Sequence, residues 1–352
     1  MHSGVIRTML RAAAVLAAAT AAVPAFAQGA AVEGRATGTE GAPVPFAVVR
    51  LVPAATGDSG VVAITDAQGW YRFGGLAPGE YRVRLDRIGV ESTVTPSFSL
   101  GSGAGVRQDL RAAARPIQLP ELRTGAPRCL AGAELGADAA LAALWSEAQK
   151  FARARAAFDR SYRYTYDRRQ RGTVRMRLVS PRHLNRDSVV TSEPDSVAAR
   201  ADRLSRERAA SGYSTQTRRS FTVTIPDEQE LLAPEFLSAH CLETSPQVVD
   251  GRWIVRFRPA GRARRGTIRG EIRIDPSSYA VDALHVEHLR GDEPFMRASI
   301  RFGDVAVPGG KVRLPVQAEF DGRPRGAVGL AVTRVQGSVS FLDHRKFERV
   351  AR

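Results

Sequence analysis

Lysine is almost absent from this chain of 352 residues. Lys150, Lys311 and Lys346 are the only lysines among its 51 basic residues, so arginine carries nearly all of the positive charge. Such a bias is typical of a GC-rich genome, and it also suits the recognition of phosphate or carboxylate groups by the planar guanidinium. The formal net charge is +15, and 43% of the residues are hydrophobic, which predicts packed globular cores and excludes a disordered chain.

Motifs for metal and nucleotide chemistry are missing as well. The sequence contains no H-E-x-x-H pair of metal ligands. No glycine-rich loop opens a helix, since Gly101–Gly105 precedes a strand-like run, and nucleotide phosphate binding therefore has no support. We expect no catalytic motif, no cofactor site, no metal site and no nucleic-acid partner.

A long apolar run occurs only at the N-terminus. Residues 1–27 combine Arg7 and Arg11 with an Ala/Val/Leu stretch and end in an A-x-A cleavage pattern at Ala27. The stretch has about 16 apolar residues, whereas a membrane-spanning helix needs roughly 20. We predict a Sec-type signal peptide that is cleaved after Ala27, a periplasmic or secreted protein, and no transmembrane helix in the mature chain.

Cysteine is scarce too, with Cys129 and Cys241 the only two in the chain. In the oxidising compartment that the leader predicts, an even pair favours a disulfide, and two unpaired thiols are the alternative. The bond would close a loop of about 112 residues and would stabilise the fold by up to about 4–5 kcal/mol on the chain-entropy model. It would join the start of the second domain to its middle.

Short β-runs separated by Gly/Pro turns fill the segment from Ala31 to Ala114. The stretches Asp66–Gly69 and Leu76–Gly79 predict turns, and Trp70–Phe73 and Tyr81–Leu85 predict strands. Strands at such regular intervals predict a β-sandwich.

A defined pattern of glycine, proline and apolar residues runs through this segment. Its members are Val32, Gly34, Gly41, Pro43, Ala47, Val49 and Leu51, then Thr65, Asp66, Gly69, Tyr71, Phe73, Leu76, Pro78, Gly79, Tyr81 and Val83. The pattern resembles the carboxypeptidase regulatory-like domain, a transthyretin-like sandwich of bacterial envelope proteins. The resemblance implies a fold and no catalysis, because in that family the module is an accessory to a separate zinc peptidase domain.

One strong helical pattern follows. Asp138 is placed to cap its N-terminus. Large apolar side chains recur on one face with a period of 3.6 residues, namely Leu141, Leu144, Trp145, Phe151 and Phe158. We expect this face to pack on a sheet, and a helix that lies on a membrane surface is the alternative.

The remaining sequence returns to strands, with one further helix. Asp227 and Glu230 form a D-x-x-E start pattern for a helix over Glu228–His240. The segment Asp195–Ala210 is either a peripheral helix or a mobile excursion. Strands are predicted at Tyr162–Tyr166, Val174–Val179, Phe221–Ile225, Trp253–Phe257, Ile268–Ile274, Ala280–Glu287, Ala298–Phe302, Val312–Phe320 and Leu330–Phe341.

The predicted fold is mainly β with some α. An N-terminal β-sandwich precedes an α+β domain whose curved, mostly antiparallel sheet packs on one long helix. The expected divisions are a signal peptide (1–27), the sandwich (28–115), a linker or crossing strand (116–136) and the α+β domain (137–352). The layout from Ile268 onward is a strand ending in Ile-Asp, a turn, a returning strand and then the sequences V-P-G-G and L-P. It is weakly similar to the half-barrel of periplasmic lipoprotein- and lipid-carrier proteins.

Two short motifs imitate a serine protease. Gly57–Gly60 copies the nucleophile box, and Ser238–Cys241 approximates the histidine box. Nucleophilic catalysis needs the serine and the histidine within hydrogen-bond reach. Ser59 and His240 fall in different predicted domains and in reversed chain order, so we expect no such site.

The sequence His285-Val286-Glu287-His288 imitates a metal site. On a strand, His285 and Glu287 share one face while His288 points to the other, so the three cannot converge on one ion without a bulge. We expect a cross-strand polar patch instead.

Two arginine-rich runs bear on partners. Arg168–Arg171 is expected at a strand end and Arg262–Arg265 in a hairpin loop, where solvated turns account for both. With an envelope location, the candidate partners are an envelope protein, a lipid or an anionic polysaccharide.

Two functional hypotheses follow from these patterns. The first is a non-catalytic cell-envelope or secreted protein, in which the sandwich is an interaction or spacer module and the curved sheet binds a partner or an apolar ligand. The alternative is an envelope hydrolase whose site is not visible in the sequence. The lining of the concave side of the sheet should discriminate them, because apolar side chains there indicate binding, whereas a hydrolase needs converging carboxylates and histidines.

Overall fold

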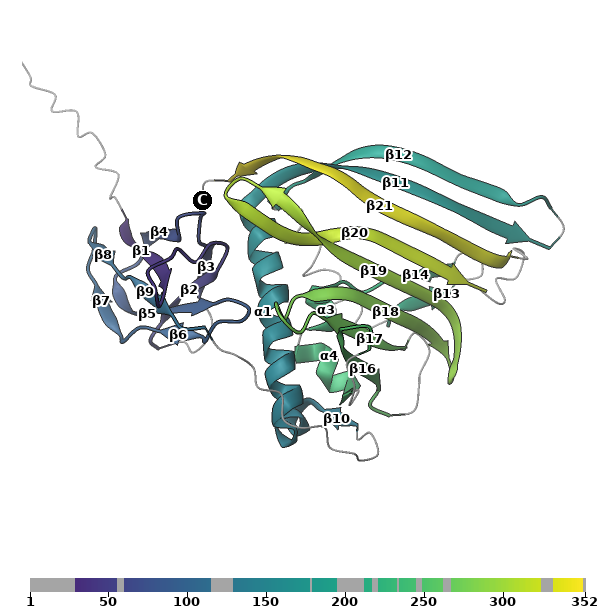
Figure 1. The fold of residues 1–352 in the computed structure, drawn as a ribbon, viewed down its shortest axis with the longest axis horizontal. Helices are drawn as coiled ribbons and strands as arrows, with labels where there is room; N and C mark the ends of the chain where they lie inside the picture. The colour runs from purple at the N-terminus through teal and green to yellow at the C-terminus, as the bar shows by residue number, and fades with distance from the viewer. Residues whose placement is uncertain are drawn as a thin grey trace, which may run out of the picture.

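The computed structural model describes residues 29–55, 60–114, 129–177, 179–194, 212–216, 221–232, 234–244, 249–261, 267–323 and 332–350. Helix α1 (Ala139–Ser161) stands between an N-terminal sandwich and a ten-stranded sheet (Figure 1). The expected signal peptide, the segment Asp195–Ala210 and the arginine run Arg262–Arg265 lie outside the described residues.

The N-terminal part is the predicted β-sandwich. Buried side chains such as Val32, Val49, Phe73, Val83 and Leu85 fill the space between its two sheets. One sheet has the order β4-β1-β8 with β9 also on β1, and the other has the order β3-β2-β5-β6 with β7 also on β5. The strands are β1 (Ala30–Gly38), β2 (Val48–Pro53), β3 (Val61–Ile64), β4 (Trp70–Leu76), β5 (Gly79–Asp86), β6 (Thr93–Val94), β7 (Phe98–Leu100), β8 (Gly105–Arg107) and β9 (Leu110–Ala112).

The second part is built on one curved sheet whose neighbouring strands are all antiparallel. Its fold class is therefore the predicted one. A separate small hairpin pairs β13 (Ser214–Gln216) with β14 (Phe221–Val223). In spatial order the large sheet contains β10 (Leu130–Ala131), β15 (His240–Thr244), β16 (Trp253–Pro259), β17 (Ile268–Ile274), β18 (Val281–Arg290), β19 (Glu293–Val307), β20 (Gly310–Gly322), β21 (Val332–Arg349), β11 (Tyr162–Met176) and β12 (Arg182–Ser192).

Two of the helices begin where their capping residues predict. The Asp138 side chain accepts the backbone N–H of Leu141 at the start of α1, and Asp227 forms a capping box with Glu230 at the start of α3 (Glu228–Leu231). The single helix expected over Glu228–His240 is wrong. A second helix, α4 (Pro234–Ala239), starts at a proline, which has no N–H to continue the preceding turn, and the chain enters β15 at residue 240.

The apolar face of α1 packs on the sheet, as expected. Leu141, Leu144, Trp145 and Phe151 lie in one buried cluster with sheet residues such as Phe302, whose ring meets that of Phe151 edge-on at 5.7 Å. The alternative, a helix on a membrane surface, would leave these side chains exposed. No helix within the described residues is long and apolar enough to cross a bilayer.

Phe158 also packs on this sheet, as expected, and it does so at the junction with the sandwich. Its cluster contains Ile64 of β3 and Leu314 of β20, and its ring stacks on Tyr162 at 4.8 Å. The helical period placed Phe158 on the same face as Trp145. A helix of 23 residues is long enough for the two ends of that face to meet different neighbours.

Polar contacts also fix the sandwich to α1. The buried side chains of Glu147 and Lys150 form an ion pair of 2.7 Å. Glu147 accepts the backbone N–H of Gly89 at 2.9 Å, and Lys150 donates to the carbonyl of Val90 at 2.6 Å. The sandwich is therefore held against the helix by buried contacts.

The disulfide prediction is confirmed. Cys129 and Cys241 are bonded, with their Cα atoms 5.1 Å apart. The bond lies where β10 pairs with β15, at one edge of the large sheet. It anchors the chain entering the second domain to that edge.

The placement of the first arginine run is wrong. Arg168–Arg171 lies inside β11, which pairs along its length with β12 and β21. These three strands reach beyond α1 (Figure 1), so arginines on either face can extend into solvent.

Candidate functional site

Side chains of the large sheet alternate between an apolar face, which packs on the helices, and a polar face. Two rows of cross-strand neighbours cross the polar face. The His285 row comprises Glu243, Arg256, Glu271, His285, Ser299, Glu319, Ser338 and Arg171. The Glu287 row comprises Arg269, Glu287, Arg297, Asp321, Gln336 and Thr173.

A third row lies between these two and forms the floor. It runs through Phe257, Gly270, Val286, Ala298, Phe320, Gly337 and Gly172. By strand alternation its side chains point to the apolar face, and Phe257, Val286 and Ala298 are buried there. The floor therefore presents backbone to the polar face.

These rows, together with Arg258, line a groove of about 960 Å³. The volume is at the upper end of the range for ligand sites. Unlike most such sites, the groove is edged by charged and hydroxyl side chains. Its geometry suits a polar, extended ligand.

The carboxylates of the groove are engaged by arginines. Glu287 accepts Nε–H bonds from Arg269 and from Arg297, each at 2.7 Å. Partial burial works to raise the pKa of Glu287, but the two guanidinium groups outweigh it and hold the pKa below its usual value. Glu271 is bound in the same way by Arg273, at 2.9 and 2.8 Å. Glu287 is therefore ionised at neutral pH.

The centre of the groove holds polar groups that remain available. The side chains of His285, Ser299 and Ser338 make no hydrogen bond to another described residue. Burial lowers the pKa of His285, and the Arg273 guanidinium lowers it further, so the imidazole is neutral near pH 7. A neutral imidazole can donate one hydrogen bond and accept another.

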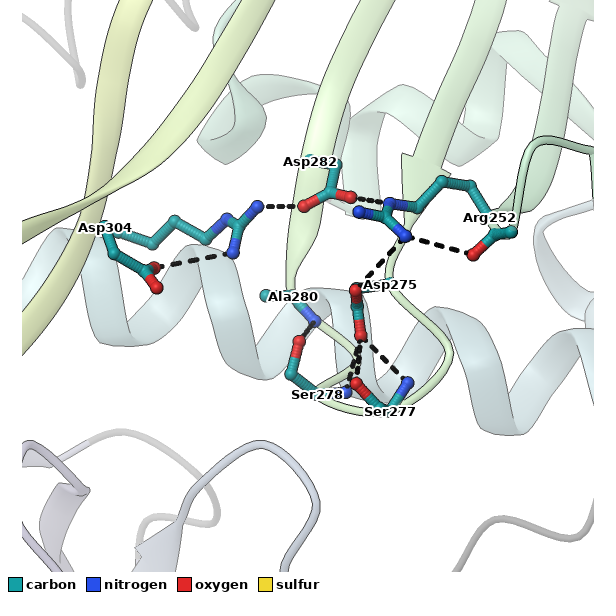
Figure 2. Close-up of polar contacts among 9 residues, drawn as sticks. Arg252, Asp275, Ser277, Ser278, Ala280, Asp282 and Asp304 are labelled. Carbon is teal, nitrogen blue, oxygen red and sulfur yellow. Dashed lines mark hydrogen bonds and ion pairs between the residues drawn. The ribbon is translucent and has the colours of Figure 1, made fainter.

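A second charged cluster joins the ends of the same strands (Figure 2). Asp282 accepts from both Arg252 and Arg313, while Arg252 also reaches Asp275 and Arg313 also reaches Asp304, each at 3.4 Å. Three further bonds from Ser277 and Ser278 hold the pKa of Asp275 well below its usual value. Each carboxylate here is paired within the protein, so this cluster links the ends of neighbouring strands.

The residues that the sequence singled out fall in different places. His285 and Glu287 share the polar face, and His288 is buried on the apolar face, as strand alternation predicts. His240 is a core residue that stacks on Phe236 at 4.0 Å, with its Nδ1 3.1 Å from the carbonyl oxygen of Phe236. Ser59 lies outside the described residues.

Most groove residues were missed by the sequence analysis. A signal was present, because charged or hydroxyl residues occupy alternate positions in several successive strands, such as Arg269/Glu271 and Arg297/Ser299. That pattern predicts a polar face. The groove itself also requires the register between strands, which no local pattern contains.

The described part of the chain contains no group of side chains suited to a metal ion. No three His, Cys, Asp or Glu side chains there are grouped so that they could hold an ion. The groove carboxylates lie beside guanidinium groups, whose positive charge opposes cation binding.

Comparison with known proteins gives distant structural likenesses. No curated protein matches the sequence. A catechol 1,2 dioxygenase mutant from Acinetobacter radioresistens matches with 12% identity and a TM-score of 0.20, over 29% of this chain and 57% of that chain. A LolA superfamily protein from Nitrosomonas europaea matches with 9% identity and a TM-score of 0.26, over 56% of this chain and 92% of that chain.

A putative carbohydrate binding protein from Bacteroides uniformis matches with 10% identity and a TM-score of 0.21, over 74% of this chain and 100% of that chain. The chain thus spans little more than half of the dioxygenase. TM-scores this low carry no argument about fold or function.

The N-terminal segment is identified by its sequence. The model of the carboxypeptidase regulatory-like domain matches residues 31–113, which covers all the strands of the sandwich except the first residue of β1. The two-sheet architecture and the glycine and proline pattern agree with this match. Residues 31–113 are therefore a carboxypeptidase regulatory-like domain.

Proposed function

We propose that this chain is a non-catalytic cell-envelope or secreted protein whose groove binds an extended, hydrogen-bonding ligand. One observation carries the proposal: a groove of about 960 Å³ crosses the polar face and presents the available side chains of His285, Ser299 and Ser338. The disulfide between Cys129 and Cys241 supports an oxidising compartment.

In this proposal the sandwich is a fixed support for the ligand-binding sheet. The buried contacts of Glu147 and Lys150 with the loop at Gly89 and Val90 favour a rigid connection over a mobile spacer. A fixed connection keeps the sheet in one orientation relative to whatever the sandwich contacts.

The groove favours binding over hydrolysis. Glu271, His285 and Ser299 are neighbours in one row, the order that an acid, a base and a nucleophile would need. Activation of a serine requires hydrogen bonds along that series. Within the described residues, Glu271 bonds to Arg273 instead, and neither Ser299 nor Glu271 bonds to the imidazole.

Blocking the groove tests the proposal. Wild-type protein should bind one or more chains on an array of neutral and acidic polysaccharides. Ser338→Trp should reduce that binding at least tenfold, because an indole would fill the groove. Ser102→Trp, in an exposed turn of the sandwich, is the matched control and should bind as the wild type does. Equal binding by Ser338→Trp, or an array without any bound chain, would contradict the proposal.

A further inference from the structure

Arg269 and Arg297, the two arginines beside Glu287, have N–H groups that are not used in hydrogen bonds to other described residues. Arg269 and Arg297 each donate one Nε–H to this carboxylate, and no other side-chain bond of either is formed within the described residues. A guanidinium carries five N–H groups. The terminal nitrogens of both arginines are therefore available, and their fork geometry matches a carboxylate bound by two parallel hydrogen bonds.

Arg256 adds a third available guanidinium. Its Nε lies 3.9 Å from Glu271, too far for a hydrogen bond, and 52% of the side chain is exposed. Glu271 is already occupied by both nitrogens that Arg273 directs at it. Around Glu271 and Glu287 there are thus twice as many guanidinium groups as carboxylates.

Positive charge is in excess at one end of the groove, although five arginines and five carboxylates balance over the whole lining. Strands β16 to β19 carry these four arginines, whereas β20 contributes Glu319 and Asp321. Asp321 is neutralised by two bonds from Arg334, and Glu319 accepts an amide bond from Gln317. A ligand matched to this lining carries negative charge beside Arg256, Arg269 and Arg297 and uncharged polar groups beside Ser299 and Ser338.

We propose that the ligand is an anionic glycan, a polysaccharide chain with carboxylate groups. Its carboxylates bind Arg256, Arg269 and Arg297, and its hydroxyl groups bond to His285, Ser299 and Ser338. This inference rests on the proposed function and names the ligand class for that groove. The glycan lies across the strands, because the arginines and serines that contact it follow the cross-strand rows.

The floor favours a glycan over an acidic peptide. Its larger side chains, including Phe257, Val286 and Phe320, point away from the groove by strand alternation. An extended peptide would direct alternate side chains at this floor, and a specific site would need pockets for them. A glycan presents hydroxyl groups along its length and needs no such pockets.

Polygalacturonate and its methyl ester form a matched pair of probes, because esterification removes the charge and leaves the sugar chain. By isothermal titration calorimetry, polygalacturonate should bind at least tenfold more tightly than the methyl ester. The affinity should fall as salt is raised, since the arginines are partly exposed. Arg269→Gln and Arg297→Gln should each weaken binding about tenfold, the loss expected for one charge-assisted contact.

The control is Arg186→Gln, which removes the same charge from β12, outside the groove. It should bind polygalacturonate nearly as the wild type does. Thermal unfolding of all three variants shows whether they remain folded, which their exposed positions favour. If either groove variant unfolds, Arg269→Lys or Arg297→Lys takes its place. Lysine keeps the positive charge but cannot form two parallel hydrogen bonds to a carboxylate, so this variant should bind with intermediate affinity.

The two proposals fail in different ways. Equal binding of the ester and the acid, abolished by Ser338→Trp and unaffected by the arginine variants, would leave the polar groove as a binding site and overturn the anionic ligand. Equal binding of poly-glutamate and polygalacturonate, with the same arginine dependence, would overturn the choice of a glycan. If no chain binds to the wild type, the proposed function itself is wrong.

Discussion

The two faces of the large sheet are made by the same strands, but one is apolar and covered while the other is polar and open. In β18, Val286 is 1% exposed within the apolar core, and its neighbour Glu287 lies in the groove with two arginines. The apolar face is covered by α1, α3 and α4, whereas the polar face is open. Strand alternation thus separates the residues that stabilise this domain from those available for binding.

This separation has an energetic consequence. Each large apolar side chain buried on the covered face contributes roughly 1.5–3 kcal/mol. Ion pairs on the open face contribute little, because water and salt screen them and ordering the side chains costs entropy. Substitutions on the two faces should therefore differ in kind, with stability lost on one and affinity changed on the other.

The strongest test of this comparison is Trp145 on the covered face. The side chain is 2% exposed, so Trp145→Ala should lower the free energy of unfolding by about 3–5 kcal/mol. Trp145→Phe should lower the free energy of unfolding less, because the indole Nε1–H has no hydrogen-bond partner among the described residues and its removal leaves no acceptor unpaired. Denaturant titration measures both. Unchanged unfolding together with lost binding to lipid vesicles would instead place this helix face at a membrane surface.

A pH titration tests the same face through His288. This imidazole is fully buried, and burial lowers its pKa from 6.5 to about 4. The folded pKa lies below the unfolded one, so the unfolded chain binds the proton first as the pH falls. Stability is therefore lost between about pH 6.5 and pH 4, by about 3 kcal/mol for this group.

His288→Leu should remove that part of the pH dependence, and His183→Leu, at an exposed position in β12, serves as the control. The measurement is the free energy of unfolding at several pH values between 4 and 7, a range set by those two pKa values. An unchanged slope in His288→Leu would show that other groups control acid stability.

Much of the fold could be predicted because its signals are local. Asp138 and Asp227 cap helices at the places that their spacing to the apolar residues indicated. The placement of His285 opposite to His288 follows from strand alternation alone. The carboxypeptidase regulatory-like pattern likewise lies within one contiguous segment.

The groove and the junction could not be predicted because they depend on contacts between distant parts of the chain. Arg171 and Glu243 line the same groove from strands that lie far apart in the sequence, and only the register of the sheet between them sets their positions. Lys150 meets the carbonyl of Val90, a backbone group that no side-chain pattern marks. The break before Pro234 was a local signal that the helix prediction overlooked.

A glycine in the floor tests how closely the two faces are coupled. A Cβ on Gly337 would lie 2.5 Å from the carbonyl oxygen of Arg171 and 2.8 Å from the ring of Phe320. Gly337→Ala should therefore cost about 1–3 kcal/mol through overpacking, and by shifting the floor it should also weaken ligand binding. Ser338→Ala, one residue further and on the polar face, should change the unfolding free energy much less. Similar stability of the two variants in denaturant would show that the floor is free to adjust.

The smallest effect on stability is expected at Glu287 on the open face. Glu287→Gln keeps the size of the side chain and removes the charge that Arg269 and Arg297 share, and its unfolding free energy should change by less than about 1 kcal/mol.

The same substitution should strengthen ligand binding, because the two guanidinium groups lose their competing carboxylate. Affinity for polygalacturonate should rise at low salt and approach the wild-type value as salt is added. Glu348→Gln, on an exposed position of β21, removes the same charge outside the groove and should leave affinity unchanged. A loss of affinity in Glu287→Gln would mean that this carboxylate is needed to position the arginines, and that the open face, like the covered one, depends on its internal contacts.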